Sequence, residues 1–251
     1  MKPFYWIYKK KLWRQIKNND MPEHIGIILD GNRRYARERN LPPWYGHEAG
    51  AEAVEHILKY CFKLGIKILT LYAFSTENFN RAEKEVQKIM EIAKRKFKEI
   101  MEHPMIHKYK VKIKAIGRIY RLPENLQKII QEAEEKTSNY NDFQINIAIS
   151  YGGRKEIVDC MKRIGQKIKD KKLNIEDINE DTIEEHLYTK GLPDPELIIR
   201  TSGEERLSGF LLWQSAYSEL IFLELYWPAI RKIDLWRAIR VFQQRNRRFG
   251  Q

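Results

Sequence analysis

Positions 30–34 of the chain combine a carboxylate, two small loop residues and two arginines, in the order Asp30-Gly31-Asn32-Arg33-Arg34. They follow the apolar run 25–29, which is typical of a buried strand. Glycine lets the backbone approach a ligand closely, a helix start offers unpaired N–H groups, and planar guanidiniums match phosphate oxygens. Asp30 can hold Mg²⁺, which usually bridges a carboxylate and substrate phosphates. The segment indicates a site for a phosphate and its metal ion, although an ordinary strand-to-helix turn with solvated arginines stays open.

Three further polar clusters follow predicted strands and repeat this arrangement. They are Ser75-Thr76-Glu77-Asn78-Phe79-Asn80-Arg81, Ser150-Tyr151-Gly152-Gly153-Arg154 and Arg200-Thr201-Ser202-Gly203-Glu204-Glu205-Arg206-Leu207-Ser208. Ligands of an open parallel sheet bind outside the carboxyl ends of its strands, so these clusters should converge with Asp30. Guanidiniums make bidentate contacts with phosphate that lysine does not reproduce. Four arginines of these loops together could neutralise two diphosphates: Arg34, Arg81, Arg200 and Arg206.

The elements that must position these loops are short β-branched runs that alternate with helical patterns. The predicted strands cover residues 25–30, 66–74, 111–117, 143–150, 197–201 and 220–225. Residues 82–102 repeat apolar side chains with a helical period and precede Pro104, which predicts one long amphipathic helix. Strands that alternate with helices are typical of a mostly parallel sheet flanked by helices. We therefore predict a single α/β domain with about six strands.

The composition limits the partners and the compartment. The chain has 251 residues with 43% hydrophobic content, enough for a substantial core, and a net charge of +12 that attracts anions. Nucleic acid, an acidic membrane face and phosphorylated small molecules are all compatible with this charge. No apolar stretch approaches the roughly 20 residues that cross a bilayer. Cys61 and Cys160 lie far apart without a zinc or disulfide pattern, so we predict a reducing, cytoplasmic location.

The first twenty residues predict an N-terminal amphipathic helix, separate from a main domain over residues 21–251. Tyr5, Tyr8, Leu12 and Ile16 recur at helical spacing, whereas most basic side chains of this segment lie elsewhere on the helix surface. Such a helix suits docking on the protein body, which we favour, or resting at a membrane surface. Peripheral membrane association therefore stays open.

Two titratable residues outside the arginine loops are candidates with ordinary alternatives. His47 follows the first loop and either donates to a phosphate or caps a helix start. Glu219 stands just before the last predicted strand and is either a second carboxylate for Mg²⁺ or a solvated acid. The remaining histidines show no pairing that resembles a metal set, and we interpret them as structural: His24, His56, His103, His107 and His186.

Four segments, taken together and in order, resemble the cis-prenyltransferases, which are the undecaprenyl and dehydrodolichyl diphosphate synthases. They are His24-Ile25-Gly26-Ile27-Ile28-Leu29-Asp30-Gly31-Asn32-Arg33-Arg34-Tyr35-Ala36, Tyr72-Ala73-Phe74-Ser75-Thr76-Glu77-Asn78, Ile199-Arg200-Thr201-Ser202-Gly203-Glu204 and Phe210-Leu211-Leu212-Trp213-Gln214. The resemblance covers roughly residues 21–250, which would make 21–251 the catalytic domain. It is closer to archaeal and eukaryotic members, because Arg33 and Tyr35 replace a Gly and a Trp that are common in bacteria.

The resemblance implies repeated cis-condensation of isopentenyl diphosphate onto an allylic diphosphate primer, either geranylgeranyl or farnesyl diphosphate, with Mg²⁺ as the cofactor. The product would be a long, undecaprenyl-like polyprenyl diphosphate that serves as precursor of a glycosyl carrier lipid. Asp30 would be the essential catalytic acid and, with Glu219, a Mg²⁺ ligand. Asn78 would be the second catalytic residue. Because a neutral carboxamide is a poor base, we expect Asn78 to orient substrate while the leaving diphosphate takes the proton.

The other implied site residues bind the two diphosphates. The allylic diphosphate would be held by Gly31, Asn32, Arg33, Arg34, Tyr35, His47, Ser75, Thr76, Glu77, Phe79 and Arg81. Isopentenyl diphosphate would be held by Arg200, Arg206, Leu207, Ser208, Arg248 and Gly250. Arg248 and Gly250 belong to a C-terminal Arg-x-Gly that, in this family, completes the active site across the interface of a homodimer.

The growing lipid needs an apolar tunnel, which one face of the helix at 82–102 and the strand at 143–150 could line. The candidates are Val86, Ile89, Met90, Ala93, Phe97, Ile145 and Ile147, with Ala73 at the throat and Phe143 at the floor. Plain core packing is the alternative for most of them. Pro43 stands where bacterial members often have a phosphate-binding arginine, whose contact Arg33, Arg37 or Arg39 could supply.

Two other classes of function compete with this interpretation. A nucleic-acid-binding module would need a basic stripe with exposed stacking aromatics, whereas the arginines here lie in strand-end loops, so we expect no nucleic acid partner. A non-catalytic subunit of a heteromeric synthase typically lacks the first Asp motif. Asp30 and Glu219 are both present, which favours a self-sufficient enzyme.

Overall fold

The centre of the fold is a six-stranded sheet in which each neighbouring pair of strands runs parallel. The computed structural model describes residues 2–245. The strands follow the order β3-β4-β2-β1-β5-β6 across the sheet. They are β1 (His24–Ile28), β2 (Ile68–Ser75), β3 (Val111–Ile116), β4 (Phe143–Tyr151), β5 (Leu197–Thr201) and β6 (Glu219–Leu223). Each overlaps one predicted strand, so the predicted fold class is confirmed.

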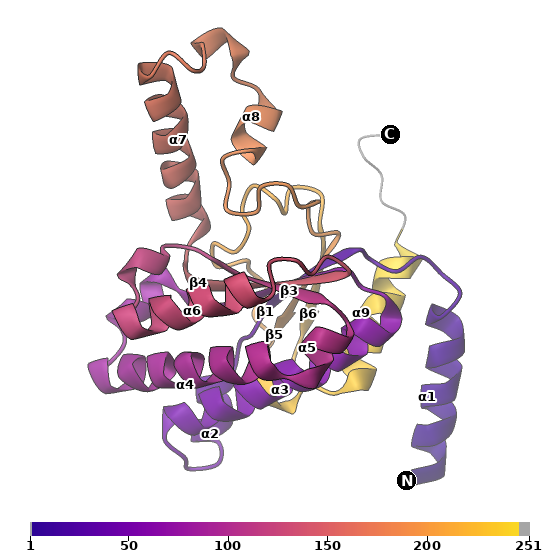
Figure 1. Cartoon of the computed structure of the whole chain (residues 1–251). Coiled ribbons are helices and arrows are strands. Elements are labelled where there is room, and N and C mark those ends of the chain that lie inside the picture. Colours follow the sequence, from indigo (N-terminus) through magenta and orange to yellow (C-terminus); the bar gives the residue numbers. More distant parts are fainter. Residues whose placement is uncertain (1, 246–251) are drawn as a thin grey trace.

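Helices connect these strands, as Figure 1 shows. The α-helices are α1 (Lys2–Ile16), α2 (Asn32–Arg37), α3 (Pro43–Leu64), α4 (Glu83–Glu102), α5 (Pro104–Lys108), α6 (Glu124–Lys136), α7 (Gly153–Lys169), α8 (Glu180–Glu184) and α9 (Lys232–Gln244). Short 3₁₀ turns are η1 (Thr76–Asn80), η2 (Ile119–Arg121), η3 (Ile175–Asp177) and η4 (Trp227–Ala229). The helix predicted over 82–102 is α4, which begins one residue later because Ala82 has a non-helical ψ of 132°.

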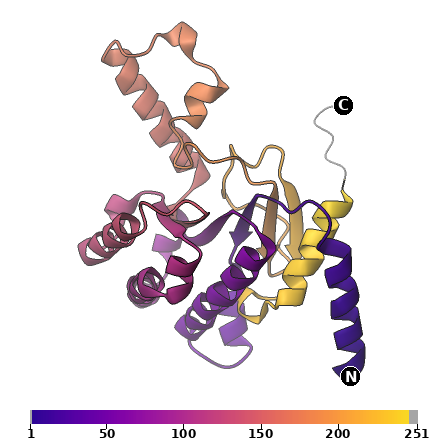
Figure 2. The ribbon, with the colours of Figure 1, turned by 45° about the vertical axis from the view of Figure 1, so that its right-hand side comes forward.

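The main hydrophobic core lies under one face of the sheet. Side chains alternate between the faces of a strand, so Ile25 and Ile27 of β1 point to the same side as Leu69 and Leu71 of β2. These residues join the apolar stripes of α3, α4, α6 and α9 in one buried cluster. Figure 2 shows these four helices together on that side of the sheet. The strands are rich in Ile and Leu because their core face is buried against these helices.

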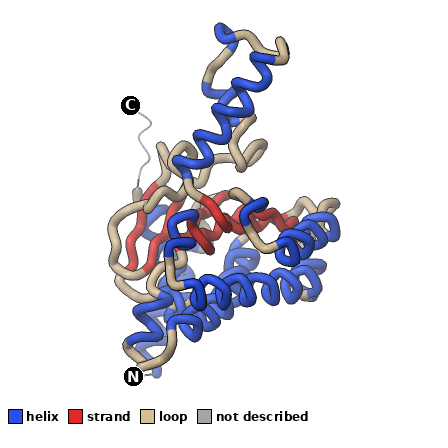
Figure 3. The backbone as a smooth tube through the Cα atoms, turned by 90° about the vertical axis from the view of Figure 1, so that its left-hand side faces the viewer, coloured by secondary structure: helices blue, strands red, loops and turns tan. Residues whose placement is uncertain are grey.

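The other face of the sheet carries a smaller buried cluster. Tyr72 stacks on Phe210 with ring centroids 4.9 Å apart and meets Tyr151 edge to face at 5.7 Å. Phe210 and its neighbour Leu211 belong to the loop between β5 and β6, so a loop covers this face. Figure 3 shows α7 and α8 projecting as an arm away from the sheet on this side.

Helix α1 packs on α9, as Figure 1 shows. Leu12 and Ile16 are fully buried, and the rings of Trp13 and Trp236 are 5.0 Å apart. The docking of this helix on the protein body is thus observed. Within residues 2–245, none of the helices combines the length and the apolar character needed to cross a bilayer.

The sheet order brings the predicted ligand-binding loops together. Strands β2, β1 and β5 are adjacent, and all three run in the same direction. Their carboxyl ends carry Ser75, Asp30 and Arg200, which therefore meet at one edge of the sheet. This convergence is the geometric basis of the candidate site.

Candidate active site

Asp30 lies two residues beyond β1, where neighbouring elements hold its backbone. The Thr201 hydroxyl donates to the Asp30 carbonyl oxygen at 2.7 Å, and the Trp227 N–H donates to the same oxygen at 2.9 Å. In the side chain, Oδ1 accepts from the Gly31 N–H at 2.7 Å, and Oδ2 accepts from Arg200 at 2.7 Å. The carboxylate is 27% exposed, so it is oriented by the protein and still accessible to solvent.

Arg200 joins Asp30 to the loop that follows β5. Its guanidinium is only 5% exposed; Nη2 donates to Asp30, while Nη1 donates to Ser208 Oγ at 2.8 Å and to the Arg206 carbonyl oxygen. The Nε–H has no hydrogen-bond partner within residues 2–245. A planar fork with several donors can bridge two loops in this way, whereas a single ammonium cannot. Arg200 therefore fixes the relative positions of both implied diphosphate sites.

The turn after Asp30 requires glycine. Gly31 has a φ of 102°, and a Cβ there would lie 2.7 Å from the Tyr226 ring. Helix α2 begins at the next residue, Asn32, and its first turn directs Arg34 toward the pocket. Arg34 donates to Glu204 at 2.9 Å and lies 3.4 Å from Asp30. The backbone geometry thus places the Asp30 carboxylate and the Arg34 guanidinium, which are four residues apart in sequence, on the same surface of the pocket.

A buried carboxylate on α4 gathers three cationic or basic side chains of the site. Glu85 Oε1 accepts from His47 Nε2 at 3.1 Å and from Arg81 at 3.1 Å, and Arg33 lies 3.6 Å away. The Glu85 side chain is 7% exposed. Burial lowers the pKa of His47, so the imidazole is neutral near pH 7. The alternative interpretation of His47 as a helix cap is wrong, because it is the fifth residue of α3 and bonds to Glu85 instead.

The turn η1 holds Asn78 beside the end of β2. The Asn78 Oδ1 accepts from the Ser75 N–H at 3.1 Å and closes a capping box. Because this carboxamide oxygen is engaged, the geometry favours an orienting role for Asn78. A β-bulge lies just before this turn, with Ala73 as the extra residue of β2. Bulges often re-aim side chains beside active sites.

A polar pocket of about 770 Å³ lies at the carboxyl ends of β1, β2 and β5. Its lining includes most of the predicted site residues, namely Asp30, Gly31, Asn32, Arg33, Arg34, His47, Ser75, Asn78, Arg81, Arg200, Arg206 and Ser208. The four arginines singled out in the sequence are all present: Arg34, Arg81, Arg200 and Arg206. The predicted convergence is therefore observed for the loops that follow β1, β2 and β5, whereas residues 150–154 are not among the described residues that line this pocket. The roles of the lining residues in binding remain predictions.

Five other predicted residues lie near the pocket without lining it. Phe79 packs edge to face on Phe74 at 4.9 Å, and the Thr76 hydroxyl donates to Glu77 at 2.8 Å. Tyr35 lies under the Arg39 guanidinium, 3.6 Å from the ring centroid, and Leu207 packs against the smaller core cluster. The last two predicted residues, Arg248 and Gly250, lie outside the described residues.

Several residues of the site were not predicted as such. Glu204 and Glu85 pair with its arginines, and Tyr72 is part of its lining. Of the arginines named as possible replacements at Pro43, Arg33 and Arg37 line the pocket, whereas Arg39 lies over the Tyr35 ring. The Arg81–Glu85 pair had no helical signal, because Arg81 is extended and lies before the first residue of α4. Tyr72 was quoted in the motif at 72–78 but was given no role, since it stands within a largely apolar strand.

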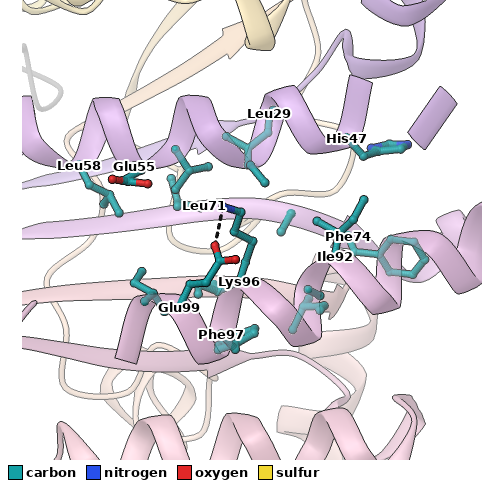
Figure 4. Close-up of a pocket in the computed structure, with 18 of the residues that line it drawn as sticks. Leu29, His47, Glu55, Leu58, Leu71, Phe74, Ile92, Lys96, Phe97 and Glu99 are labelled. Carbon is teal, nitrogen blue, oxygen red and sulfur yellow. Dashed lines mark ion pairs between the residues drawn. The ribbon is translucent and has the colours of Figure 1, made fainter. Parts of the chain in front are cut away.

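An apolar cavity of about 180 Å³ lies between α3, α4 and the sheet (Figure 4). It adjoins the polar pocket, since both are lined by Leu29, Asn32, His47, Ala73 and Phe74. Of the tunnel candidates, Ala73, Ile89, Ala93, Phe97 and Ile147 line this cavity. Phe143, expected at the floor, is not among the described lining residues and instead packs against Phe62 and Tyr109.

Glu219 lies at the opposite edge of the sheet from Asp30. It is the first residue of β6, where it pairs in register with Leu197, the first residue of β5. Arg200, which binds Asp30, is three residues further along, roughly 10 Å at the usual rise of a strand. Glu219 is instead paired with Arg245 at 2.6 Å. A single chain therefore does not bring the two predicted Mg²⁺ ligands together.

The donor set at Asp30 fits a magnesium ion that is held mainly by substrate. Within residues 2–245, no group of three or more acidic, histidine or cysteine side chains forms a complete metal site. Mg²⁺ often binds through one or two carboxylates plus substrate phosphates and water. A partly exposed Asp30 among arginines that are predicted to bind phosphate meets that requirement.

Comparison with known proteins identifies the family. Residues 28–250 match the family model described as "Putative undecaprenyl diphosphate synthase". A Methanopyrus kandleri protein named tritrans,polycis-undecaprenyl-diphosphate synthase (geranylgeranyl-diphosphate specific) is 50% identical over 100% of this chain and 92% of its own. A protein of the same name from Methanocaldococcus jannaschii is 52% identical over 97% of this chain and 88% of its own.

Two solved structures share the fold. Lavandulyl diphosphate synthase from Lavandula x intermedia, in complex with dimethylallyl diphosphate, has a TM-score of 0.87 and 36% identity over 92% of this chain and 99% of its own. A probable undecaprenyl diphosphate synthase from Campylobacter jejuni has a TM-score of 0.75 and 34% identity over 93% and 100%. The fold and the site define a prenyltransferase. The chain belongs to the undecaprenyl diphosphate synthase family of cis-prenyltransferases.

Proposed function

We propose that the chain condenses isopentenyl diphosphate repeatedly onto geranylgeranyl diphosphate and makes a long, undecaprenyl-like cis-polyprenyl diphosphate. The observation that carries this proposal is the junction of two pockets. One is polar and rich in arginine, the other is apolar, and they share Ala73 and Phe74 in their linings. This pair suits an amphiphilic molecule with a diphosphate head and a hydrocarbon tail. The names of the two archaeal relatives favour geranylgeranyl over farnesyl diphosphate as primer.

The charges at the polar pocket suit ionisation of the allylic primer. Departure of diphosphate concentrates negative charge, which preorganised guanidiniums and N–H groups stabilise best when they are already in place. Arg34, Arg81 and Arg200 are positioned for this by Glu204, Glu85 and Asp30. Asp30 would hold Mg²⁺ together with the substrate, and the ion would neutralise part of the diphosphate charge.

Proton removal completes each condensation. Asn78 uses its carboxamide oxygen within η1, so we assign it the orientation of substrate. The leaving diphosphate is then the proton acceptor, since it is an anion formed beside the reacting carbons. Release of the long product would supply the precursor of a glycosyl carrier lipid.

The direct test is incubation of purified protein with radiolabelled isopentenyl diphosphate, Mg²⁺ and either geranylgeranyl or farnesyl diphosphate. We expect labelled long-chain product, more from geranylgeranyl diphosphate, and loss of product on removal of Mg²⁺ with a chelator. Asp30→Asn should abolish elongation while circular dichroism shows an intact fold. Elongation by Asp30→Asn at the wild-type rate would contradict the assigned role.

We further propose that the active form is a homodimer. The arm formed by α7 exposes Val158 (46%) and Met161 (60%), and Tyr217 beside β6 is 70% exposed. These side chains stand on the side of the sheet that helices leave uncovered, which suits a second copy. Light scattering with size-exclusion chromatography should give twice the mass of the chain; a monomer with full activity would refute this proposal.

A last part of the proposal concerns the membrane. Helix α1 exposes Trp6 (61%) and Ile7 (55%), with Lys10 over the Trp6 ring. Tryptophan mixed with basic side chains is typical of helices that rest at a membrane surface. Vesicles that contain anionic lipid should therefore cosediment the wild type, and Trp6→Ser should weaken this. Equal sedimentation with neutral vesicles would argue against a charge-dependent contact.

A further inference from the structure

Tyr226 lies behind the turn that carries Asp30. It stands in the loop between β6 and η4 and is not among the described residues that line either pocket. A Cβ added at Gly31 would lie 2.7 Å from a ring carbon of Tyr226 and 2.9 Å from its Cβ. The tyrosine therefore packs directly against the backbone of this turn, on the side where any residue other than glycine would place its side chain.

The same side chain contacts the segment of α2 at two points, one turn apart. The Arg34 guanidinium carbon lies 5.8 Å from the centroid of the Tyr226 ring, within the range of a cation–π contact. The Tyr226 hydroxyl donates to Glu38 Oε1 at 2.6 Å. Residues four apart in helical geometry share one face, so Arg34 and Glu38 both face Tyr226. The Glu38 carboxylate raises the pKa of Tyr226, so the hydroxyl stays protonated and donates near pH 7.

The backbone around Tyr226 is held by neighbouring elements. The Trp227 N–H donates to the Asp30 carbonyl oxygen at 2.9 Å, and the buried Trp227 indole donates to a carbonyl oxygen of α3 at 2.7 Å. On the other side, the Ser202 N–H donates to the Leu225 carbonyl oxygen at 2.7 Å. Tyr226 therefore projects from a segment that is tied to α3, to the Asp30 turn and to the loop after β5.

The ring constrains Arg34 in a way that the neighbouring carboxylates cannot. Arg34 Nη1 donates to Glu204 at 2.9 Å, and Nη2 lies 3.4 Å from Asp30 Oδ1. A carboxylate competes with an incoming diphosphate for the N–H groups of an arginine, whereas an aromatic face leaves these donors free. The contact with Tyr226 is therefore compatible with a diphosphate on Arg34.

We propose that Tyr226 is a positioning residue of the primer site. This inference rests on the proposed elongation activity, in which Asp30 and Arg34 act on the primer diphosphate. The ring holds the Gly31 turn and the Arg34 guanidinium in place, and the hydroxyl holds the end of α2 through Glu38. Tyr226 acts through these residues, since it does not line the described pocket.

The test compares variants of the full chain. Tyr226→Leu removes the ring and the hydroxyl, and Tyr226→Phe removes only the hydroxyl. Tyr140→Leu is the matched control, because the Tyr140 hydroxyl bonds with His107 Nδ1 at 2.9 Å and its ring meets the His107 ring edge to face, outside the described lining of both pockets. Steady-state elongation gives kcat and the KM values of geranylgeranyl and isopentenyl diphosphate. Circular dichroism checks the fold of each variant.

We expect Tyr226→Leu to raise KM for geranylgeranyl diphosphate about tenfold and to leave KM for isopentenyl diphosphate within about twofold of the wild-type value. Tyr226→Phe keeps the ring and should raise the primer KM about threefold or less. A residue that only stabilises the fold would lower the fraction of active enzyme, and thus the apparent kcat, without changing either KM. If Tyr226→Leu does not fold, Tyr226→Met replaces it with the same expectation.

The outcomes separate the two proposals. If the wild type elongates but a folded Tyr226→Leu keeps the wild-type KM for geranylgeranyl diphosphate, the positioning role is refuted and the proposed function stands. An equal rise of this KM in the Tyr140→Leu control would also refute the positioning role. If the wild type elongates no primer, the proposed function itself fails, and the positioning role fails with it.

Discussion

Replacement of Arg200 by lysine tests whether one guanidinium organises both diphosphate sites. Arg200 is buried at the end of β5 and donates to Asp30 with one nitrogen and to the 206–208 loop with the other. Lysine keeps the positive charge but carries a compact ammonium without the planar fork. It can satisfy one side of this bridge only. The Arg200→Lys variant therefore leaves either Asp30 or Ser208 without its donor.

The size of the effect follows from the lost contact. A hydrogen bond to a charged group contributes about 1.5–3 kcal/mol. Since about 1.4 kcal/mol corresponds to a factor of ten, kcat/KM for isopentenyl diphosphate should fall roughly 10- to 150-fold. The loss should exceed that of a generic arginine replacement because Arg200 is only 5% exposed and water cannot replace the missing donor.

The assay is steady-state elongation at saturating primer with varied isopentenyl diphosphate. Arg118→Lys is the matched control, because Arg118 makes two hydrogen bonds of 2.8 Å with Asp159 and lies outside the described lining of the polar pocket. The Arg118→Lys variant loses the same kind of bidentate pair, but outside the lining of the polar pocket, so its kcat/KM should stay within about twofold of the wild-type value. A kcat/KM for Arg200→Lys within threefold of wild type would show that the fork does not organise the site.

Four other substitutions give independent tests. Burial lowers the pKa of His24 to about 4, below its unfolded value of about 6.5. The free energy of unfolding should therefore be highest above pH 6.5 and fall by about 3 kcal/mol toward pH 4. In His24→Gln the denaturant midpoint should depend less on pH over this window, and an unchanged pH dependence of the midpoint would contradict this. Gly46→Ala places a Cβ against the Asn32 carbonyl oxygen and should lower the free energy of unfolding by about 2 kcal/mol or more. Gly165→Ala places its Cβ in open space and should raise the free energy of unfolding by up to about 1 kcal/mol. Thermal unfolding measures both changes. Asn78→Asp should keep the shape of the wild-type pH–rate profile; a new limb that follows the ionisation of a carboxylate would identify position 78 as a proton acceptor.

The sequence was sufficient to predict the architecture and the edge that binds ligand. Asp30, Ser75 and Arg200 each follow an apolar run, and the carboxyl ends of parallel strands share one edge. What could not be predicted is which strands are neighbours. The order β2-β1-β5 places these three residues side by side, and it follows from the packing of distant helices rather than from any local pattern.

Contacts between helices also could not be predicted from the sequence. Glu85 stands on α4, and its pairing with Arg81 depends on the extended turn between η1 and α4. Its contacts with Arg33 of α2 and His47 of α3 depend on how these helices pack beside α4. Phe143 illustrates the same limit. The alternation of side chains along β4 correctly places Phe143 on the core face, but it does not predict whether the side chain lines a cavity or is packed within the core. Phe143 packs between aromatic rings.

The position of Glu219 links the metal site to the oligomeric state. Glu219 begins a strand that is parallel to β5, so within one chain it must lie at the amino edge of the sheet, away from Asp30. Its partner Arg245 stands at the end of α9, three residues before Arg248. Among the described residues, Glu219 is thus the predicted metal ligand that one chain does not bring to Asp30. If Glu219 serves the active site, it must come from a second copy that presents it to the carboxyl edge of the sheet. The proposals for a magnesium ligand at Glu219 and for a homodimer therefore depend on each other.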